Sequence, residues 1–170
     1  MLVLLTVSIA VVLSACGDDN PAGLEVSCEV ARDRQGEELA PSLIFEDGDT
    51  RFSVGEPIIF NMSVTNCTES KLVMRYPNAQ RYEFSVSPAS DYPREIWKWS
   101  NDQTFSQVVA EETFEEGETK TYGEAWDQKN NSGEQVSPGI YILTGDDLHC
   151  EVIDAPSDCA SGIAVTFEIN

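Results

Sequence analysis

The stretch Ile58-Ile59-Phe60-Asn61-Met62-Ser63-Val64-Thr65 decides the fold class, because large apolar side chains occupy every second position in it. Such alternation is typical of a β-strand with one buried face, since successive side chains of a strand point to opposite sides of the sheet. The same period of two returns at residues 24–30, 72–76, 82–86 and 163–169. Clusters of Gly, Pro, Asn and Asp between these segments predict turns.

The spacing of these segments predicts the architecture. About seven to nine short strands at roughly ten-residue intervals, with no long amphipathic helix and no internal repeat, indicate an all-β antiparallel sandwich. A closed barrel is the structural alternative. The domain is expected over residues 24–170. Trp97, Trp99 and Trp126 are expected in its core, because large aromatic side chains dominate the packing of such cores.

The charge balance argues against nucleic acid as a partner. The chain of 170 residues has 30 Asp or Glu and 10 Lys or Arg, which gives a formal net charge of −20. Affinity for a polyphosphate comes mainly from Lys and Arg, and the sequence has no basic tract. Hydrophobic residues still make up 41% of the chain, which is enough for a packed core. We therefore expect one acidic, globular domain.

The N-terminal segment predicts export. Residues 2–13 form an uncharged apolar run, too short for the ~20 residues that span a bilayer but suited to a secretory signal. The following Leu13-Ser14-Ala15-Cys16 resembles the lipobox of bacterial lipoproteins, in which the cysteine is lipidated and begins the mature chain. We predict a signal peptide over residues 1–15 and a lipidated Cys16 with a flexible linker over residues 16–23. The alternative is a simple signal peptide in which Cys16 has no special role.

Lipidation of Cys16 would set the location of the domain. Several acyl chains on one cysteine, at ~0.8 kcal/mol per buried methylene, hold a protein on a bilayer far more firmly than a single chain. We therefore expect a domain in the bacterial cell envelope, outside the cytoplasm, that contacts the lipid bilayer through Cys16 only.

The other cysteines are Cys28, Cys67, Cys150 and Cys159. Their even number suits disulfides in an oxidising compartment, and three pairings are possible. A short segment with turn-forming residues separates Cys150 from Cys159, so these two suit each other, which would leave Cys28 with Cys67. Zinc is the alternative, but there is no C-x-x-C and His149 is the only histidine. We expect no metal and no cofactor.

The residue types do not favour an enzyme. The chain has a single histidine, His149, and no G-x-S-x-G motif. The common catalytic arrangements of a nucleophile with a histidine base are therefore not expected. Carboxylates are abundant enough for a glycosidase, but five glutamates within residues 111–118 surround a glycine and favour a solvated loop. Calcium binding is an alternative that rests on the pairs Asp47 with Asp49 and Asp146 with Asp147. Neither pair has the spaced ligands of an EF-hand.

Short motifs follow one another through the middle of the chain. They are Phe60-Asn61-Met62-Ser63-Val64-Thr65-Asn66, Tyr82-Glu83-Phe84-Ser85-Val86, Ile96-Trp97-Lys98-Trp99-Ser100, Phe105-Ser106-Gln107, Gly117-Glu118-Thr119, Trp126-Asp127, Gly133 and Pro138-Gly139-Ile140-Tyr141. In this order they resemble the BsuPI family of bacterial intracellular proteinase inhibitors. The resemblance implies an immunoglobulin-like sandwich, and it implies a protein partner, a serine proteinase, that is inhibited by non-covalent binding.

An inhibitor of this kind would offer a stiff, exposed loop to the enzyme, because preorganisation lowers the ordering cost of binding. By composition the best candidate is Pro88-Ala89-Ser90-Asp91-Tyr92-Pro93-Arg94, in which two prolines restrict the chain. Tyr92 and Arg94 are of residue types that are enriched at binding hot spots. An ordinary hairpin connection is the alternative for this loop. For the whole domain the alternatives are a non-inhibitory adhesion or envelope module and a carbohydrate- or calcium-binding module.

Overall fold

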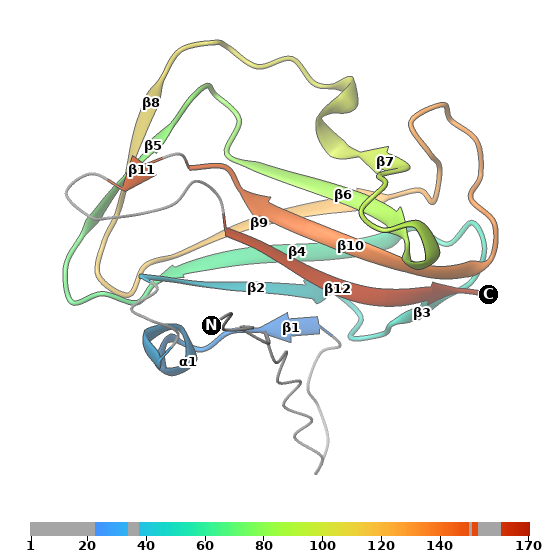
Figure 1. The fold of residues 1–170 in the computed structure, drawn as a ribbon, viewed down its shortest axis with the longest axis horizontal. Helices are drawn as coiled ribbons and strands as arrows, with labels where there is room; N and C mark the ends of the chain where they lie inside the picture. The colour runs from blue at the N-terminus through green and yellow to red at the C-terminus, as the bar shows by residue number, and fades with distance from the viewer. Residues whose placement is uncertain (1–22, 34–37, 150, 153–160) are drawn as a thin grey trace, which may run out of the picture.

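The computed structural model describes residues 23–33, 38–149, 151–152 and 161–170, shown in Figure 1. Its elements are β1 (Gly23–Glu25), α1 (Cys28–Asp33), β2 (Leu39–Phe45), β3 (Arg51–Phe52), β4 (Ile58–Asn66), β5 (Leu72–Tyr76), β6 (Tyr82–Pro88), η1 (Ala89–Asp91), β7 (Trp97–Lys98), η2 (Trp99–Asp102), β8 (Ala110–Phe114), β9 (Thr119–Trp126), β10 (Gly139–Asp147), β11 (Glu151–Val152) and β12 (Ser161–Ile169). Eight of these described strands have five residues or more, within the range that the sequence predicts.

The strands form an antiparallel sandwich, which confirms the predicted fold class. One sheet has the order β1-β2-β4-β9, and the second has the order β3-β12-β10-β6-β7. A third, small sheet, β11-β5-β8, extends one end of the sandwich (Figure 1). Within the described strands, all neighbours pair antiparallel except the short β3, which runs parallel to β12.

The strand β4 shows why the sequence folds in this way. Its side chains Ile58, Phe60, Met62 and Val64 are all fully buried, while the residues between them are half-buried or exposed. Phe60 packs edge-to-face on Phe84 of β6, with 4.8 Å between ring centroids, and so joins the two large sheets. Burial of this apolar face is the main favourable term of folding, at about 25 cal/mol per Å² of apolar surface.

The strand expected over residues 24–30 is wrong in its second half. Strand β1 ends at Glu25, and the short helix α1 begins at Cys28. The side chain of Ser27 accepts a hydrogen bond from the backbone N–H of Val30 at 3.3 Å, as an N-cap residue does. Val30 is 42% exposed, where the strand pattern predicted burial. The cap therefore outweighs an alternation that extends over only a few residues.

A disulfide joins α1 to the end of β4. Cys28 and Cys67 are bonded, with 5.1 Å between their Cα atoms, across 39 residues of sequence. This confirms the Cys28–Cys67 part of the predicted pairing. Cys150, Cys159, Cys16 and the signal segment lie outside the described residues. No helix in the described part of the chain has the length and apolar character needed to cross a membrane.

Candidate interaction site

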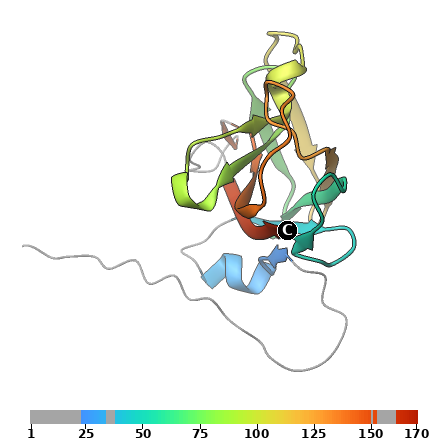
Figure 2. The same cartoon turned by 90° about the vertical axis from the view of Figure 1, so that its right-hand side faces the viewer.

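The candidate loop that the sequence predicts over residues 88–94 begins at Pro88, the half-buried last residue of β6, and continues as an exposed turn toward β7. We call residues 89–95 the charged turn, because it contains Asp91, Arg94 and Glu95. Every residue of it is exposed, and Tyr92 is 50% exposed. Figure 2 shows η1, its first part, projecting from the side of the sandwich. The structure thus places both predicted contact residues, Tyr92 and Arg94, at the surface.

The charged turn is held by its own hydrogen bonds. The backbone N–H of Arg94 donates to the carbonyl of Asp91 at 2.8 Å. The guanidinium of Arg94 pairs with the carboxylate of Asp91 at 3.0 Å. Beyond the turn, the N–H of Ile96 donates to the carbonyl of Val86 at 2.8 Å. The chain in this turn is therefore compact and folded back on itself rather than extended.

Two acidic side chains, the buried Glu83 and the half-buried Asp146, lie near Lys98, whose ammonium is 3.8 Å from both Glu83 and Glu95 of the charged turn. Glu83 of β6 is 5% exposed and accepts hydrogen bonds from the backbone N–H of Ser100 and the side chain of Gln80, both at 3.0 Å. Asp146 of β10 lies opposite Glu83 in the sheet. Burial raises the pKa of Asp146, the negative charge of Glu83 raises it further, and the ammonium of Lys98 opposes these effects.

An aromatic stack covers one open side of the sandwich. Its rings are Tyr122, Tyr82, Trp99 and Phe105, with successive centroid distances of 4.7, 4.4 and 5.7 Å. The hydroxyl of Tyr82 donates to Glu124 at 2.7 Å. Burial, followed by this carboxylate, raises the pKa of Tyr82. The stack fixes η2 and the chain after it to the sheets.

The predicted core tryptophans differ in their burial. Trp126 is 1% exposed, and its indole N–H donates to the carbonyl of Lys129 at 2.8 Å. Trp97 and Trp99 are half-buried and pack against the main core from its edge. Trp97 touches Trp126 with 5.8 Å between ring centroids.

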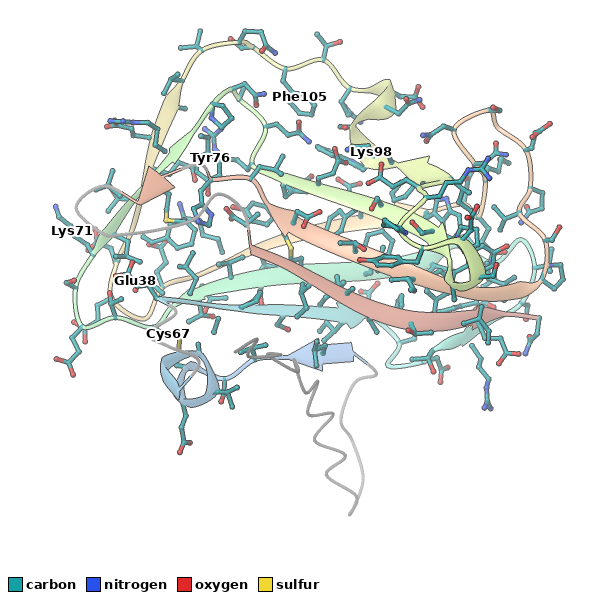
Figure 3. All side chains as sticks on the ribbon, in the orientation of Figure 1. Glu38, Cys67, Lys71, Tyr76, Lys98 and Phe105 are labelled. Carbon is teal, nitrogen blue, oxygen red and sulfur yellow. A yellow bond between two sulfur atoms is a disulfide. The ribbon has the colours of Figure 1, made fainter. Side chains whose placement is uncertain are left out.

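A second exposed stretch follows η2 and was not singled out from the sequence. We call residues 103–109 the valine segment, because Val108 and Val109 are 66% and 58% exposed. In Figure 3, Phe105 lies on this segment, which crosses from η2 to β8. A signal was present in the sequence, since residues 103–110 contain no charged side chain in a chain that is 24% charged.

A comparison with models of known protein families shows the family of the domain. The family model of BsuPI, described as intracellular proteinase inhibitor, matches residues 47–146. The chain belongs to the BsuPI family. Both exposed stretches, the charged turn and the valine segment, lie within the matched residues of the BsuPI domain.

Solved structures add only distant likenesses to the BsuPI domain. A β-glucosidase from Listeria innocua in complex with glucose is 12% identical, with a TM-score of 0.42 over 78% of this chain and 16% of that one. The β-glucosidase EmGH1 from Erythrobacter marinus is 9% identical, with a TM-score of 0.44 over 78% and 15%. Spo0M, a sporulation control protein from Bacillus subtilis, is 12% identical, with a TM-score of 0.41 over 78% and 49%.

The chain spans about a sixth of the length of these β-glucosidases and about half of Spo0M. A search of curated proteins found no match to the sequence.

The motifs that carried the resemblance mostly support the BsuPI fold. Asn66, at the end of the β4 motif, is 1% exposed. Its amide nitrogen donates to the carbonyls of Ser70, Phe114 and Glu115 at 2.8, 3.2 and 3.0 Å. Tyr141, in the Pro-Gly-Ile-Tyr motif, donates from its hydroxyl to the carbonyl of Ser137. The side chains of Asn66 and Tyr141 therefore stabilise connections of the fold and are not free for a partner.

The one described histidine is paired away from solvent. His149 is 3% exposed, and its Nδ1 lies 2.7 Å from a carboxylate oxygen of the fully buried Asp147. The hydroxyl of Tyr76 donates to the other oxygen of Asp147 at 3.4 Å. Burial and then the charge of Asp147 raise the pKa of Tyr76 and bring that of Tyr122 to about 12. A substrate could not reach this histidine in the described fold.

The calcium alternative is weakened by the alternation of β10. Asp147 is fully buried and bonded to His149, whereas Asp146 pairs in register with Glu83 on the opposite face of the strand. The two carboxylates therefore do not converge. Among the described residues, no group of three or more His, Cys, Asp or Glu side chains is arranged to hold a metal ion.

Basic side chains of the BsuPI domain are mostly engaged in ion pairs. Arg75 pairs with Glu111 at 2.9 Å, while Arg81 and Lys120 both contact Glu112. Burial acts to raise the pKa of Glu112, but the hydrogen bonds from Arg81 and Lys120 outweigh it and hold this pKa below its ordinary value. These cations stabilise the small sheet and are less available for a partner.

Proposed function

We propose that this BsuPI domain inhibits a serine proteinase by non-covalent contact, outside the cytoplasm, while a lipid on Cys16 ties it to a membrane. The observation that carries the proposal is the match of residues 47–146 to a family of proteinase inhibitors. The tether rests on the sequence alone, where an apolar run of twelve residues ends in Leu13-Ser14-Ala15-Cys16.

The geometry supports contact rather than bond-breaking chemistry. The Asp147–His149 pair is buried, whereas the charged turn and the valine segment are exposed on a rigid sandwich. Short segments that a scaffold holds in place lose little conformational entropy on binding, which is the physical requirement for a tight inhibitor. Tyr92, with half of its surface exposed, is a side chain of the type that anchors protein interfaces.

Enzyme titration tests the inhibition. Purified full-length protein in detergent is titrated into trypsin, chymotrypsin, elastase and subtilisin, and residual activity is measured on small chromogenic substrates. We expect at least one enzyme to be inhibited with a dissociation constant below about 1 μM, which corresponds to about 8 kcal/mol of binding free energy. If micromolar protein slows none of the four, the inhibitor proposal is wrong.

A separate experiment tests the tether. Membranes and cytosol are separated, and the N-terminal peptide is identified by mass spectrometry. Acyl mass on Cys16 in the membrane fraction is expected, and an unmodified N-terminus that includes residues 1–15 in the cytosol would contradict it.

One observation favours a second candidate, a non-inhibitory interaction module. The outer face of the first sheet carries only uncharged side chains on its two last strands, β4 and β9, although the chain has a net charge of −20. The residues of this face are Ile59, Asn61, Ser63, Thr65, Thr119, Thr121, Gly123 and Ala125. A charge added at Thr121 would weaken capture of an envelope partner without affecting enzyme inhibition, which separates the two functions.

A further inference from the structure

The valine segment is unusual for the surface of so acidic a protein. No charged residue occurs from position 103 to position 110, although 24% of the chain is charged. Val108 and Val109 are the two most exposed large hydrophobic side chains in the described part of the chain. Single exposed apolar residues are common, but two adjacent valines within an uncharged stretch form a continuous apolar contact.

Contacts on its N-terminal side hold the valine segment to the domain. The ring of Phe105 is half-buried and lies 5.7 Å from that of Trp99, its neighbour in the aromatic stack. The carbonyl of Ser106 accepts a hydrogen bond from the backbone N–H of Ala79 at 2.9 Å. After the valines, Ala110 pairs with Tyr76 in the small sheet. Val108 and Val109 therefore lie between two fixed points, and binding would cost little ordering entropy.

The backbone of the valine segment differs in local structure from that of the charged turn. Residues 103–109 run from η2 to β8 without a helix, turn or bend. Extended chains bind to clefts and sheet edges by main-chain hydrogen bonds, while pockets select alternate side chains. The charged turn differs, because η1 and the Asp91–Arg94 hydrogen bonds fold it back.

The valine segment also lies far from the predicted tether. Figures 1 and 2 both show it at the end of the molecule opposite β1 and α1. The described chain begins with β1 at Gly23, and Cys16 precedes it by seven residues. A domain tied to a membrane through Cys16 could therefore present this end to an enzyme in solution.

We propose that the valine segment enters the substrate cleft of the inhibited serine proteinase and that Val108 occupies its specificity pocket. This inference rests on the proposed function and deepens it. A specificity pocket receives one side chain of the inhibitor, and Val108, at 66% exposed, is more accessible than Val109, at 58%. A short branched apolar side chain fits a small apolar pocket of the elastase type rather than the acidic pocket of trypsin.

Inhibition constants of matched variants test this assignment. The full-length protein and the variants Val108→Asp, Val109→Asp and Val54→Asp are titrated into trypsin, chymotrypsin, elastase and subtilisin. Val54 is the control, since it is 47% exposed in the connection between β3 and β4 and lies outside the valine segment. A carboxylate in an apolar pocket is strongly disfavoured, so we expect Val108→Asp to weaken inhibition of elastase by roughly 100-fold or more.

The expected pattern is specific. Val108→Asp loses inhibition, Val109→Asp loses less, and Val54→Asp inhibits like the unchanged protein, with melting temperatures that agree among all four. Val108→Ala keeps most of the inhibition, because a smaller apolar side chain still enters the pocket. Equal inhibition by the unchanged protein and Val108→Asp would overturn the inference while leaving the proposed function intact.

Two further outcomes would also contradict the assignment of Val108. Inhibition of trypsin alone, lost on Arg94→Ala, would move the contact to the charged turn and overturn the assignment of Val108. If the unchanged protein inhibits none of the enzymes, the proposed function fails, and the inference fails with it.

Discussion

The charged turn and the valine segment are two exposed stretches of similar length that the domain presents differently. The charged turn pairs Asp91 with Arg94 at 3.0 Å, and its backbone bends through η1. The valine segment has no charge and no turn, and its most exposed side chains are apolar. In the charged turn, the guanidinium of Arg94 is already paired with the carboxylate of Asp91. The side chains of Val108 and Val109 are apolar and form no such pair.

The comparison shows that composition and geometry favour different loops. From the sequence, the charged turn is the predicted contact loop, because it contains Tyr, Arg and Pro and such residues are common in binding loops. The structure shows that the Arg94 guanidinium would have to leave Asp91 before it could enter an acidic pocket. Val108 needs no such rearrangement.

Loss of the Cys28–Cys67 disulfide is the largest change expected for stability. The bond closes a loop of 39 residues, so by the chain-entropy estimate the Cys28→Ser/Cys67→Ser variant loses roughly 3 to 4 kcal/mol of unfolding free energy. Both exposed stretches lie far from this bond in sequence, so inhibition at low temperature should remain. Urea unfolding followed by tryptophan fluorescence measures the loss.

This variant is preferable to a reducing agent, which would also act on any bond between Cys150 and Cys159. A variant that unfolds at the same urea concentration as the unchanged protein would show that the disulfide does not contribute to the stability of the domain.

The substitution Phe105→Ala should affect the two stretches unequally. It removes the ring that rests on Trp99, and aromatic pairs contribute ~0.5–1.5 kcal/mol beyond their buried area. The valine segment would then have to be ordered on binding, so inhibition should weaken by about 10-fold, and the melting temperature should fall by a few degrees. Inhibition constants and calorimetry measure the two effects.

Phe105→Leu serves as the control, because it keeps an apolar anchor. An Ala variant that inhibits as well as the Leu variant would contradict the idea that the anchor preorders the segment.

The substitution Asp146→Asn tests the pair of acidic side chains, Asp146 and Glu83, that lie opposite each other in the second sheet. Because burial and Glu83 raise the pKa of Asp146 in the folded state, the ionised group costs stability once the pH rises through that pKa. The Asn variant should therefore melt at a higher temperature at pH 7. The gain should shrink toward acid and vanish below the ordinary Asp pKa of about 3.9, where the carboxyl is neutral in both states. Melting curves from pH 3 to pH 8 measure it.

The opposite pH trend, with the Asn variant less stable at pH 7, would show that Asp146 makes a favourable ion pair there. Glu83→Gln is the companion variant, since it removes the neighbouring charge.

The substitution Asp91→Ala should have the smallest effect. The Asp91–Arg94 pair is exposed on both sides, and such pairs contribute about 0.2–1 kcal/mol to stability. It also frees the guanidinium, so any inhibition of trypsin through the charged turn should strengthen, while inhibition of elastase stays the same. Stronger inhibition of elastase by this variant would link the two stretches and contradict their separation.

The sequence predicted the parts of this protein in which one physical signal dominates. Alternation over nine residues identified β4, because a shift by one residue would expose Phe60 and Met62 together. Alternation over residues 24–30 misled, because the Ser27 cap and the bond of Cys28 to Cys67 favour a short helix there. The order of the short motifs from Phe60 to Tyr141 predicted the family, and the match of the BsuPI family model to residues 47–146 confirms it.

The contact surface was harder to predict, because exposure depends on contacts between segments far apart in sequence. Nothing local shows that Phe105 would turn inward onto Trp99 while Val108 stays outside. Nor does the sequence show that Arg94 would pair with Asp91. The only sequence signal for the valine segment was a run of uncharged residues in an acidic chain. This signal indicates a contact surface only when the structure shows that the run is exposed.

Amide hydrogen exchange of the complex with elastase tests the central claim most directly. Exchange is compared between the free and the bound full-length protein by mass spectrometry of peptic peptides. The account predicts slower exchange on binding in peptides that cover residues 106–110, with no change across residues 89–95. Protection of residues 89–95 with unchanged exchange at residues 106–110 would contradict it.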